Sequence, residues 1–475
     1  MPKIAMIGAG SVIFCKTLLN DILATPALAE SDIALMDLSE PKLRRMEAFA
    51  KRMVKENHLG AKISATLDRR EAIRDADYVI IMIQVGGVEA FRWDYEIPLK
   101  YGVDQCIGDS LGPGGVFRAL RSIPVLADIA RDMAELAPEA LLLNYANPMG
   151  ANCHALGRVA DVAYIGLCHG VQTTLDLISR YVNVPKDQVD FLCAGINHMA
   201  WFLRLRDKRT GEDLYPTLRA NMEKPEYYVN EKVRGEVMRQ FGYFMTESTG
   251  HLSEYLPWFR SSKRAMEQYC DQPDFGGASG AYYKYCAALA EKFTKVDYLE
   301  HESPKIDHRS VEYCSYILEA AETDNPFRLN GNVRNDGYIT NLPTGCCVEV
   351  PVFVDKRGLH PVRVGNLPPQ LAALNQSNVS VQALATEAAL TSDPELAVHA
   401  VAMDPLTSAC CTLEEVRRMA AEMFEAQKKW LPQFKGKSLR ETPVISIPAK
   451  CKAVDVPMDP ALAIANRFGE LAQAK

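Results

Sequence analysis

The alternation of short apolar segments with helical patterns in the first half of the chain constrains the fold most strongly. Between apolar segments, residues 40–58 and 118–136 carry apolar side chains three and four positions apart, as helices with one buried face do. Strands that alternate with helices form parallel sheets covered on both faces. We therefore predict an α/β fold with a Rossmann-like, doubly wound parallel sheet. The predicted strands are residues 4–7, 33–36, 78–83, 141–145, 162–167 and 189–194.

The pattern changes after residue 196. Residues 331–369 are rich in glycine, proline and asparagine with short alternating strands, and four other segments have helical patterns. The 475 residues exceed the size at which a single core stops growing. We predict a first domain of residues 1–196 and a larger α+β domain of residues 197–475, with the site in the cleft between them. The helical segments are residues 214–244, 276–290, 381–400 and 413–430.

Charge and composition exclude several classes of protein. There are 53 lysines and arginines against 60 acidic residues, a net charge of −7, which argues against a nucleic-acid partner. Apolar runs such as residues 78–85 are far shorter than the ~20 residues of a membrane helix, so no membrane partner is expected. The thirteen cysteines are an odd number, and Met1 leads directly into a strand pattern without a signal peptide, which favours the reducing cytoplasm.

A glycine turn follows the first predicted strand and suggests a dinucleotide site. Gly8, Gly10 and Ser11 stand where exposed backbone N–H groups at a helix N-terminus can hold a pyrophosphate. Ile13 replaces the third glycine of the usual pattern. Asp37 follows the second strand, where a carboxylate can bind ribose hydroxyls and repel the 2′-phosphate of NADP. We predict NAD binding; the alternative is a capping aspartate beside an ordinary turn.

Two polar clusters follow later strands. Cys168 and His169 come after one predicted strand, and Asn197 and His198 after the next. A thiolate and an imidazole from neighbouring strand ends can hold one divalent cation and leave positions open for a substrate. The alternative is a free cysteine and a hydrogen-bonded histidine in the core.

Six segments, in one order over nearly the whole chain, carry a family resemblance: residues 8–10, 109–121, 144–148, 168–170, 197–198 and 341–343. Together they resemble glycoside hydrolase family 4, whose motifs follow the same order. The resemblance implies NAD, a divalent metal (usually Mn²⁺), and hydrolysis of a small glycoside by oxidation at C3, metal-assisted elimination, water addition and re-reduction. It also implies that residues 1–196 bind NAD, that residues 197–475 serve substrate binding and dimerisation, and that the chain forms a homodimer or homotetramer.

The resemblance also implies roles for single residues. Cys168 and His198 match the metal ligands, and Asn147 matches the asparagine that contacts the sugar. For the base that removes the C2 proton we favour Tyr255, with Glu254 as the second candidate. A tyrosine near a cation can have its pKa of ~10 lowered. The alternative is that the aromatic segment 255–258 only packs one domain on the other. Further substrate-binding residues expected from the motifs are His169, Asn197 and Arg118.

The residues after the metal cysteine bear on the substrate. Cys168 followed by His169 resembles members that act on non-phosphorylated glycosides, and we favour an α-galactosidase. Gly170 is found in uronide-specific members, so an α-galacturonidase or α-glucuronidase is the alternative. Arg118, His251 or Arg260 would then hold a C6 carboxylate. Two other classes stay open: a plain NAD-dependent dehydrogenase and a non-enzymatic NAD-sensing module.

Overall fold

The computed structural model describes residues 1–295, 297–461 and 468–469. Residues 1–438 form one compact unit, and residues 439–475 form a second. In the second unit, the side chains of residues 440–461 are exposed. Within the described part of the chain, every helix is too short or too polar to cross a lipid bilayer.

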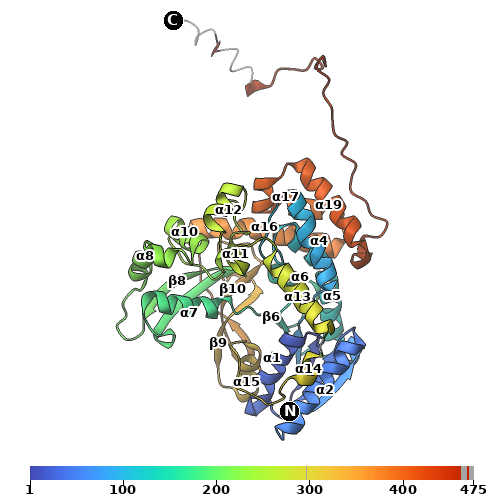
Figure 1. Ribbon diagram of the computed structural model, residues 1–475, viewed down its shortest axis with the longest axis vertical. Coiled ribbons are helices and arrows are strands. Elements are labelled where there is room, and N and C mark those ends of the chain that lie inside the picture. Colours follow the sequence, from blue (N-terminus) through green and yellow to red (C-terminus); the bar gives the residue numbers. More distant parts are fainter. Residues whose placement is uncertain (296, 462–467, 470–475) are drawn as a thin grey trace. The chain divides into compact units, whose positions relative to one another are not determined.

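One sheet of eleven strands runs through the compact unit (Figure 1). Its first six strands are parallel, in the order β3-β2-β1-β4-β5-β6. Five of them were predicted, and the Rossmann-like α/β fold is confirmed. Strand β3 was not predicted, because it lies at the sheet edge, half exposed, and lacks a continuous apolar run. The six strands are β1 (Lys3–Ile7), β2 (Asp32–Met36), β3 (Lys62–Thr66), β4 (Tyr78–Ile81), β5 (Leu141–Asn144) and β6 (Tyr164–Gly166).

The sixth predicted strand does not continue the parallel sheet. It is β7, which pairs antiparallel with β8 and β10, while β9 takes the place beside β6. The sheet is therefore extended by antiparallel strands from later in the sequence, and β11 pairs with β10 off the main path. The five strands are β7 (Val189–Ile196), β8 (Met199–Asp207), β9 (Phe327–Arg334), β10 (Cys347–Asp355) and β11 (Gly358–Pro361).

Helices surround the parallel strands. On α5, Leu126, Ile129 and Met133 are fully buried against strand residues such as Val79 and Leu142. This burial follows from the apolar face that the sequence predicted. The helices of the parallel half are α1 (Val12–Leu23), α2 (Glu40–Glu56), α3 (Arg69–Ile73), α4 (Gly87–Lys100), α5 (Gly112–Leu136), α6 (Met149–Val159) and α7 (Gly170–Val182).

The middle of the chain forms several short helices. The single helical segment predicted over residues 214–244 is three helices, because Pro225 cannot continue α8 and Gly242 ends α10 with a φ of 89°. The helices are α8 (Tyr215–Met222), α9 (Pro225–Tyr228), α10 (Lys232–Phe241), α11 (Thr249–Leu252), α12 (Lys263–Tyr269), α13 (Ala281–Lys295), α14 (Tyr298–His301) and α15 (Cys314–Thr323).

The last helices of the compact unit return to the first part of the chain. Helices α16 and α17 pack on α5, and α19 packs on α4 (Figure 1). The predicted boundary at residues 196 and 197 falls between β7 and β8, so strands on both sides of it share one sheet. The roles predicted for residues 1–196, NAD binding, and for residues 197–475, substrate binding and dimerisation, stay a prediction. The four helices are α16 (Pro369–Thr391), α17 (Pro394–Met403), α18 (Pro405–Cys410) and α19 (Leu413–Gln427).

Candidate active site

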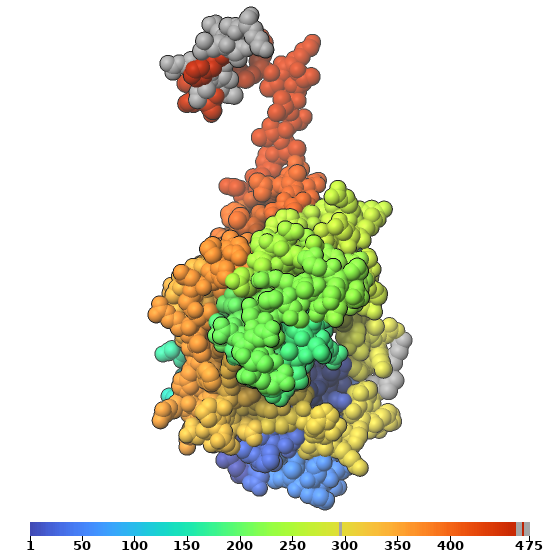
Figure 2. All heavy atoms as spheres, turned by 90° about the vertical axis from the view of Figure 1, so that its left-hand side faces the viewer, coloured from blue at the N-terminus to red at the C-terminus, as the bar shows by residue number. Residues whose placement is uncertain are grey.

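A cavity of about 730 Å³ opens at the carboxyl ends of the parallel strands. Its lining includes residues that directly follow β4, β5 and β6, and Ser11 four positions after β1, at the place where doubly wound sheets bind ligands. In Figure 2 the dark blue N-terminal segment lies at the bottom of a recess between green and yellow segments. Those segments also contribute to the cavity lining, which places the opening of the cavity on this face.

The predicted dinucleotide turn forms one end of this cavity. Gly8 has a φ of 93°, and a Cβ there would lie 2.8 Å from the carbonyl oxygen of Met82, so only glycine fits. Ser11 is the N-cap of α1 and lines the cavity. The backbone N–H groups of Gly10 and Ser39 donate to the two carboxylate oxygens of Asp37, each at 2.8 Å. This fixes the carboxylate beside the turn, where a ribose could be bound.

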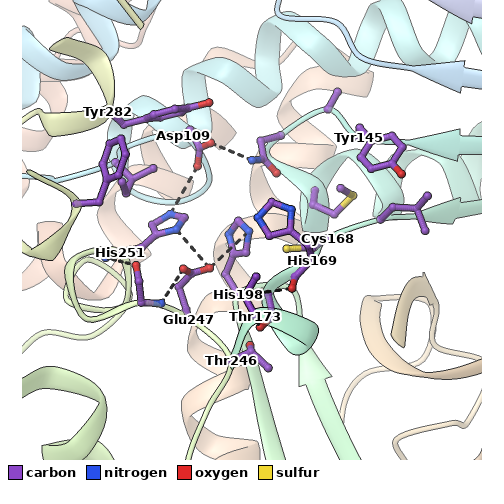
Figure 3. Close-up of a pocket in the computed structure, with 18 of the residues that line it drawn as sticks. Asp109, Tyr145, Cys168, His169, Thr173, His198, Thr246, Glu247, His251 and Tyr282 are labelled. Atoms are coloured by element: carbon purple, nitrogen blue, oxygen red, sulfur yellow. Dashed lines mark hydrogen bonds and ion pairs between the residues drawn. The ribbon is translucent and has the colours of Figure 1, made fainter. Parts of the chain in front are cut away.

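Two histidines and a glutamate form a cluster in the middle of the cavity (Figure 3). One ligand atom from each of His198, Glu247 and His251 lies within 4.8 Å of the others. Glu247 Oε2 is 3.7 Å from His198 Nε2 and 3.5 Å from His251 Nδ1. This spacing suits one divalent cation.

The turn between β7 and β8 places the first of these histidines. It consists of Asn197 and His198, and His198 has a left-handed φ of 63°, uncommon for a residue other than glycine. His251 belongs to α11, and Glu247 directly precedes its N-cap Ser248; the start of this helix brings the two side chains to within 3.5 Å.

The pKa values of the two histidines in the cluster are shifted in opposite directions. Burial lowers the pKa of His198 to about 4, although Glu247 opposes this effect. Burial also disfavours charged His251, but Glu247 outweighs it and raises the pKa of His251 to about 9. The pKa of Glu247 is lowered, because the two histidines outweigh its burial. In the metal-free protein His251 therefore carries a proton that a bound cation would have to displace.

Cys168 and His169 lie next to the cluster, on the β6 side of the cavity (Figure 3). Burial raises the pKa of the Cys168 thiol well above its usual range, and the carboxylates of Glu349 and Glu247 raise it further. His169 Nδ1 is 3.1 Å from the carboxylate of Glu312, which raises the pKa of His169. The two predicted metal ligands, Cys168 and His198, thus line one cavity.

Tyr255 lies behind the two histidine rings. Its hydroxyl is 2.9 Å from His198 Nδ1 and 3.2 Å from His251 Nε2. Ser110 also approaches His198 Nδ1, at 3.3 Å. Because Nδ1 of His198 is held in this way, its Nε2 is the atom that faces Glu247. Burial, followed by the charge of Asp109, raises the pKa of the Tyr255 hydroxyl well above 10.

Asn147, Asp109 and Arg118 form another part of the cavity lining. The amide of Asn147 donates to Asp109 Oδ2 at 2.9 Å, and all three side chains line the cavity. Arg118 is 6% exposed, and its Nε and Nη2 have no hydrogen-bond partner. Its guanidinium lies over the ring of Phe91 at 4.4 Å and is 4.0 Å from the carboxylate of Asp109. Arg118 therefore has two buried donors without hydrogen-bond partners, of which Nε lies 4.0 Å from Asp94 Oδ2.

Seven of the residues predicted from the sequence lie outside the cavity lining: Gly8, Gly10, Asp37, Asn197, Glu254, Tyr255 and Arg260. Both oxygens of Glu254 accept hydrogen bonds from the loop at residues 105–108, including the N–H groups of Ile107 and Gly108. Arg260 is fully buried, pairs with Asp104 and donates to the carbonyl of Gly277 at 2.9 Å. Asn197 is buried beside His198 without lining the cavity.

Sequence reasoning did not assign Asp109, Glu247 or His251 to the metal cluster or its surroundings. The spacing of Glu247 and His251 was the one available signal, since four residues separate two possible ligands at the start of a helix. Nothing in the sequence indicated that this helix faces the β7–β8 turn.

Two family models match the chain. Residues 3–184 match the model described as "Family 4 glycosyl hydrolase", and residues 193–407 match "Family 4 glycosyl hydrolase C-terminal domain". Residues 185–192 lie between the two matches.

Similar proteins include bacterial enzymes of about the same length. An alpha-galactosidase of Rhizobium meliloti is 43% identical over 91% of this chain and 89% of its own length. An alpha-galactosidase of Bacillus subtilis is 40% identical over 92% of this chain and its entire length. Among solved structures, the 6-phospho-beta glucosidase of Thermotoga maritima with manganese, NAD+ and glucose-6-phosphate has a TM-score of 0.74. It is 23% identical and covers 90% of this chain and 98% of its own, which supports the fold.

Proposed function

We propose that this chain, which belongs to family 4 of the glycosyl hydrolases, hydrolyses non-phosphorylated α-galactosides. The single observation that carries the proposal is the shared cavity. Ser11 at the end of the glycine turn, the cluster of His198, Glu247 and His251, and Asn147 all line one cavity. The names of the two relatives at 40% identity or more support the galactoside.

NAD is the cofactor that we propose for the turn. The close approach of Gly8 to Met82 leaves room only for bare backbone, as a pyrophosphate site needs. Asp37 is fixed by two N–H donors, and its negative charge favours ribose hydroxyls over the phosphate of NADP.

A divalent cation, Mn²⁺ in the first instance, fits the cluster. Imidazole and carboxylate donors suit Mn²⁺, and the donor atoms are already near one another. We propose His198 as the central ligand, with Cys168 beside it as the resemblance implies and with Glu247 and His251 as further candidates. Burial opposes ionisation of the Cys168 thiol, so its ligation depends on the charge of the cation.

When bound, NAD supplies reversible hydride transfer at C3 of the sugar and the cation supplies charge stabilisation at the C2 and C3 oxygens. The side chains have the remaining tasks. We propose that Asn147, oriented by Asp109, binds a sugar hydroxyl. In its phenolate form Tyr255 accepts the C2 proton on its oxygen, and as the resulting hydroxyl it returns that proton; the oxygen lies against both histidines. Its raised pKa in the metal-free protein means that this role depends on a cation nearby.

A panel of p-nitrophenyl glycosides with NAD, Mn²⁺ and a thiol reductant tests the function. We expect the highest kcat/KM with the α-galactoside and little turnover of a 6-phosphoglucoside. A higher value for an α-galacturonide or α-glucuronide would overturn the galactosidase in favour of a uronidase, with Arg118 as the residue that has donors without hydrogen-bond partners for a carboxylate. Net release of NADH would indicate a dehydrogenase, and no turnover of any glycoside an NAD-sensing module.

We also propose a cytoplasmic homodimer or homotetramer. All thirteen cysteines are free thiols, which suits a reducing compartment. Apolar side chains of the second unit, such as Val444, Ile445 and Ile447, are 69–85% exposed, as residues of an interface between copies would be in a single chain. Light scattering at several concentrations tests the assembly, and a monomer at all of them would refute it.

A further inference from the structure

Three aromatic side chains line the cavity beside Asp109 and His251. Phe275 precedes α13, and Tyr282 and Tyr285 belong to α13. The ring of Phe275 meets those of Tyr282 and Tyr285 edge-on, with centroids 6.1 Å and 5.6 Å apart. We call these three residues the aromatic wall. Phe275 is 41% exposed and Tyr285 is 47% exposed, so ring surface is available to a ligand.

The aromatic wall is fixed to the rest of the site. The N–H groups of Gly280 and Tyr282 donate to the carbonyls of Gln105 and Cys106 at 2.8 and 3.1 Å, a few residues before Asp109. The ring of Tyr282 packs against Phe91 at 5.6 Å, and Phe91 lies under the guanidinium of Arg118. These contacts fix the position of the aromatic wall relative to the side chains around the metal cluster.

The position of the wall relative to the proposed cofactor suggests its ligand. Tyr282 and Tyr145 lie on opposite sides of the cavity, with the histidine cluster between them (Figure 3). Tyr145 is on the cofactor side, because its ring packs against Phe14 of α1, 4.8 Å away. In a pyranose, C1 and C3 flank C2. If C3 faces the cofactor and C2 the cluster, C1 and its leaving group face the aromatic wall.

We propose that the aromatic wall is the binding site for the leaving group and that the preferred leaving group is a second sugar ring. This inference rests on the proposed function. Aromatic rings bind the C–H face of a sugar by apolar contact, and Phe275 and Tyr285 offer that surface without an added charge. A small alkyl group on C1 would gain little from the wall, because it is too short to cover two rings.

The test compares two α-galactosides that differ only in the leaving group, melibiose with its glucose unit and methyl α-galactoside. The measured quantity is the ratio of their kcat/KM values with NAD and Mn²⁺ present. We expect this ratio to fall about 5-fold in Phe275→Ala and in Tyr285→Ala, the order of one aromatic contact. The matched control is Phe353→Ala on β10, because Phe353 is 43% exposed and lies outside the cavity lining. We expect it to keep the wild-type ratio.

The outcomes separate the inference from the function on which it rests. A ratio that is unchanged in both wall variants, while the wild type hydrolyses α-galactosides, would overturn the inference and leave the function intact. An equal fall in the control would also overturn it. If the wild type hydrolysed neither galactoside, the proposed function would fail and the inference with it.

Discussion

Replacing Tyr255 with phenylalanine removes one buried hydroxyl and leaves the ring in place. The hydroxyl contacts His198 Nδ1 at 2.9 Å and His251 Nε2 at 3.2 Å, so both rings lose a partner. Loss of a group that orients a metal ligand typically lowers metal affinity by about 10- to 100-fold. If the same hydroxyl removes the C2 proton, the rate falls by a further ~10²- to 10⁴-fold. We expect both effects in Tyr255→Phe.

A manganese titration of turnover separates the two effects. An orienting role alone would shift the titration to higher Mn²⁺ and restore the wild-type kcat at saturation. A catalytic base gives a low kcat at every Mn²⁺ concentration, and this is the expected result. The matched control is Tyr164→Phe, since the Tyr164 hydroxyl, like that of Tyr255, is buried outside the cavity lining but has no hydrogen-bond partner. A wild-type titration and kcat in Tyr255→Phe would refute the reasoning.

Three further predictions concern the metal, the reaction path and the stability. Cys168→Ser and His198→Ala should each lose bound manganese and turnover but still bind NAD, as metal analysis and NAD titration would show. A variant with the wild-type metal content would show that its residue is not a metal ligand. Hydrolysis in D₂O should leave deuterium at C2 of the released galactose, measured by NMR, because the proposed path removes and replaces that proton; unlabelled product would rule the path out. Burial, and then the charge of Arg158, lowers the pKa of His154 to about 4, whereas the unfolded value is 6.5. Because the folded protein holds His154 neutral, its contribution to stability is fully present above pH 6.5 and is lost as the pH falls toward 4. The free energy of unfolding should therefore fall by about 2 kcal/mol between pH 7.5 and 5. Urea unfolding of His154→Gln should show a weaker pH dependence than the wild type, and an equal dependence would contradict this account.

The parallel half of the fold could be predicted because its strands are continuous apolar runs. Strands such as β4 and β5 are buried along their whole length, and the sequence shows this directly. The order of the antiparallel strands could not be predicted. Strand β9 joins β6 through the pair Gly166 and Asn332, and no local pattern indicates contacts between residues so far apart in the chain.

The candidate site was predictable where residues follow strands. Cys168 and His198 both line the cavity, as their positions after predicted strands suggested. The approach of Glu247 and His251 depends on how α11 packs, which their spacing does not determine. Likewise, only the structure shows that the carboxylate of Glu254 holds the backbone of the loop before Asp109.

The continuous sheet limits how this enzyme can be divided. A cut between residues 196 and 197 would separate β7 from β8, and it would leave β6 without β9 as its neighbour. Unpaired strand edges of this kind favour aggregation. The two halves are therefore not interchangeable modules, and a chimera of two relatives joined at this turn would have to match both sides of the sheet. Recombination for new substrate preferences is better confined to surface segments such as residues 274–285, which carry the aromatic wall and lie outside the sheet.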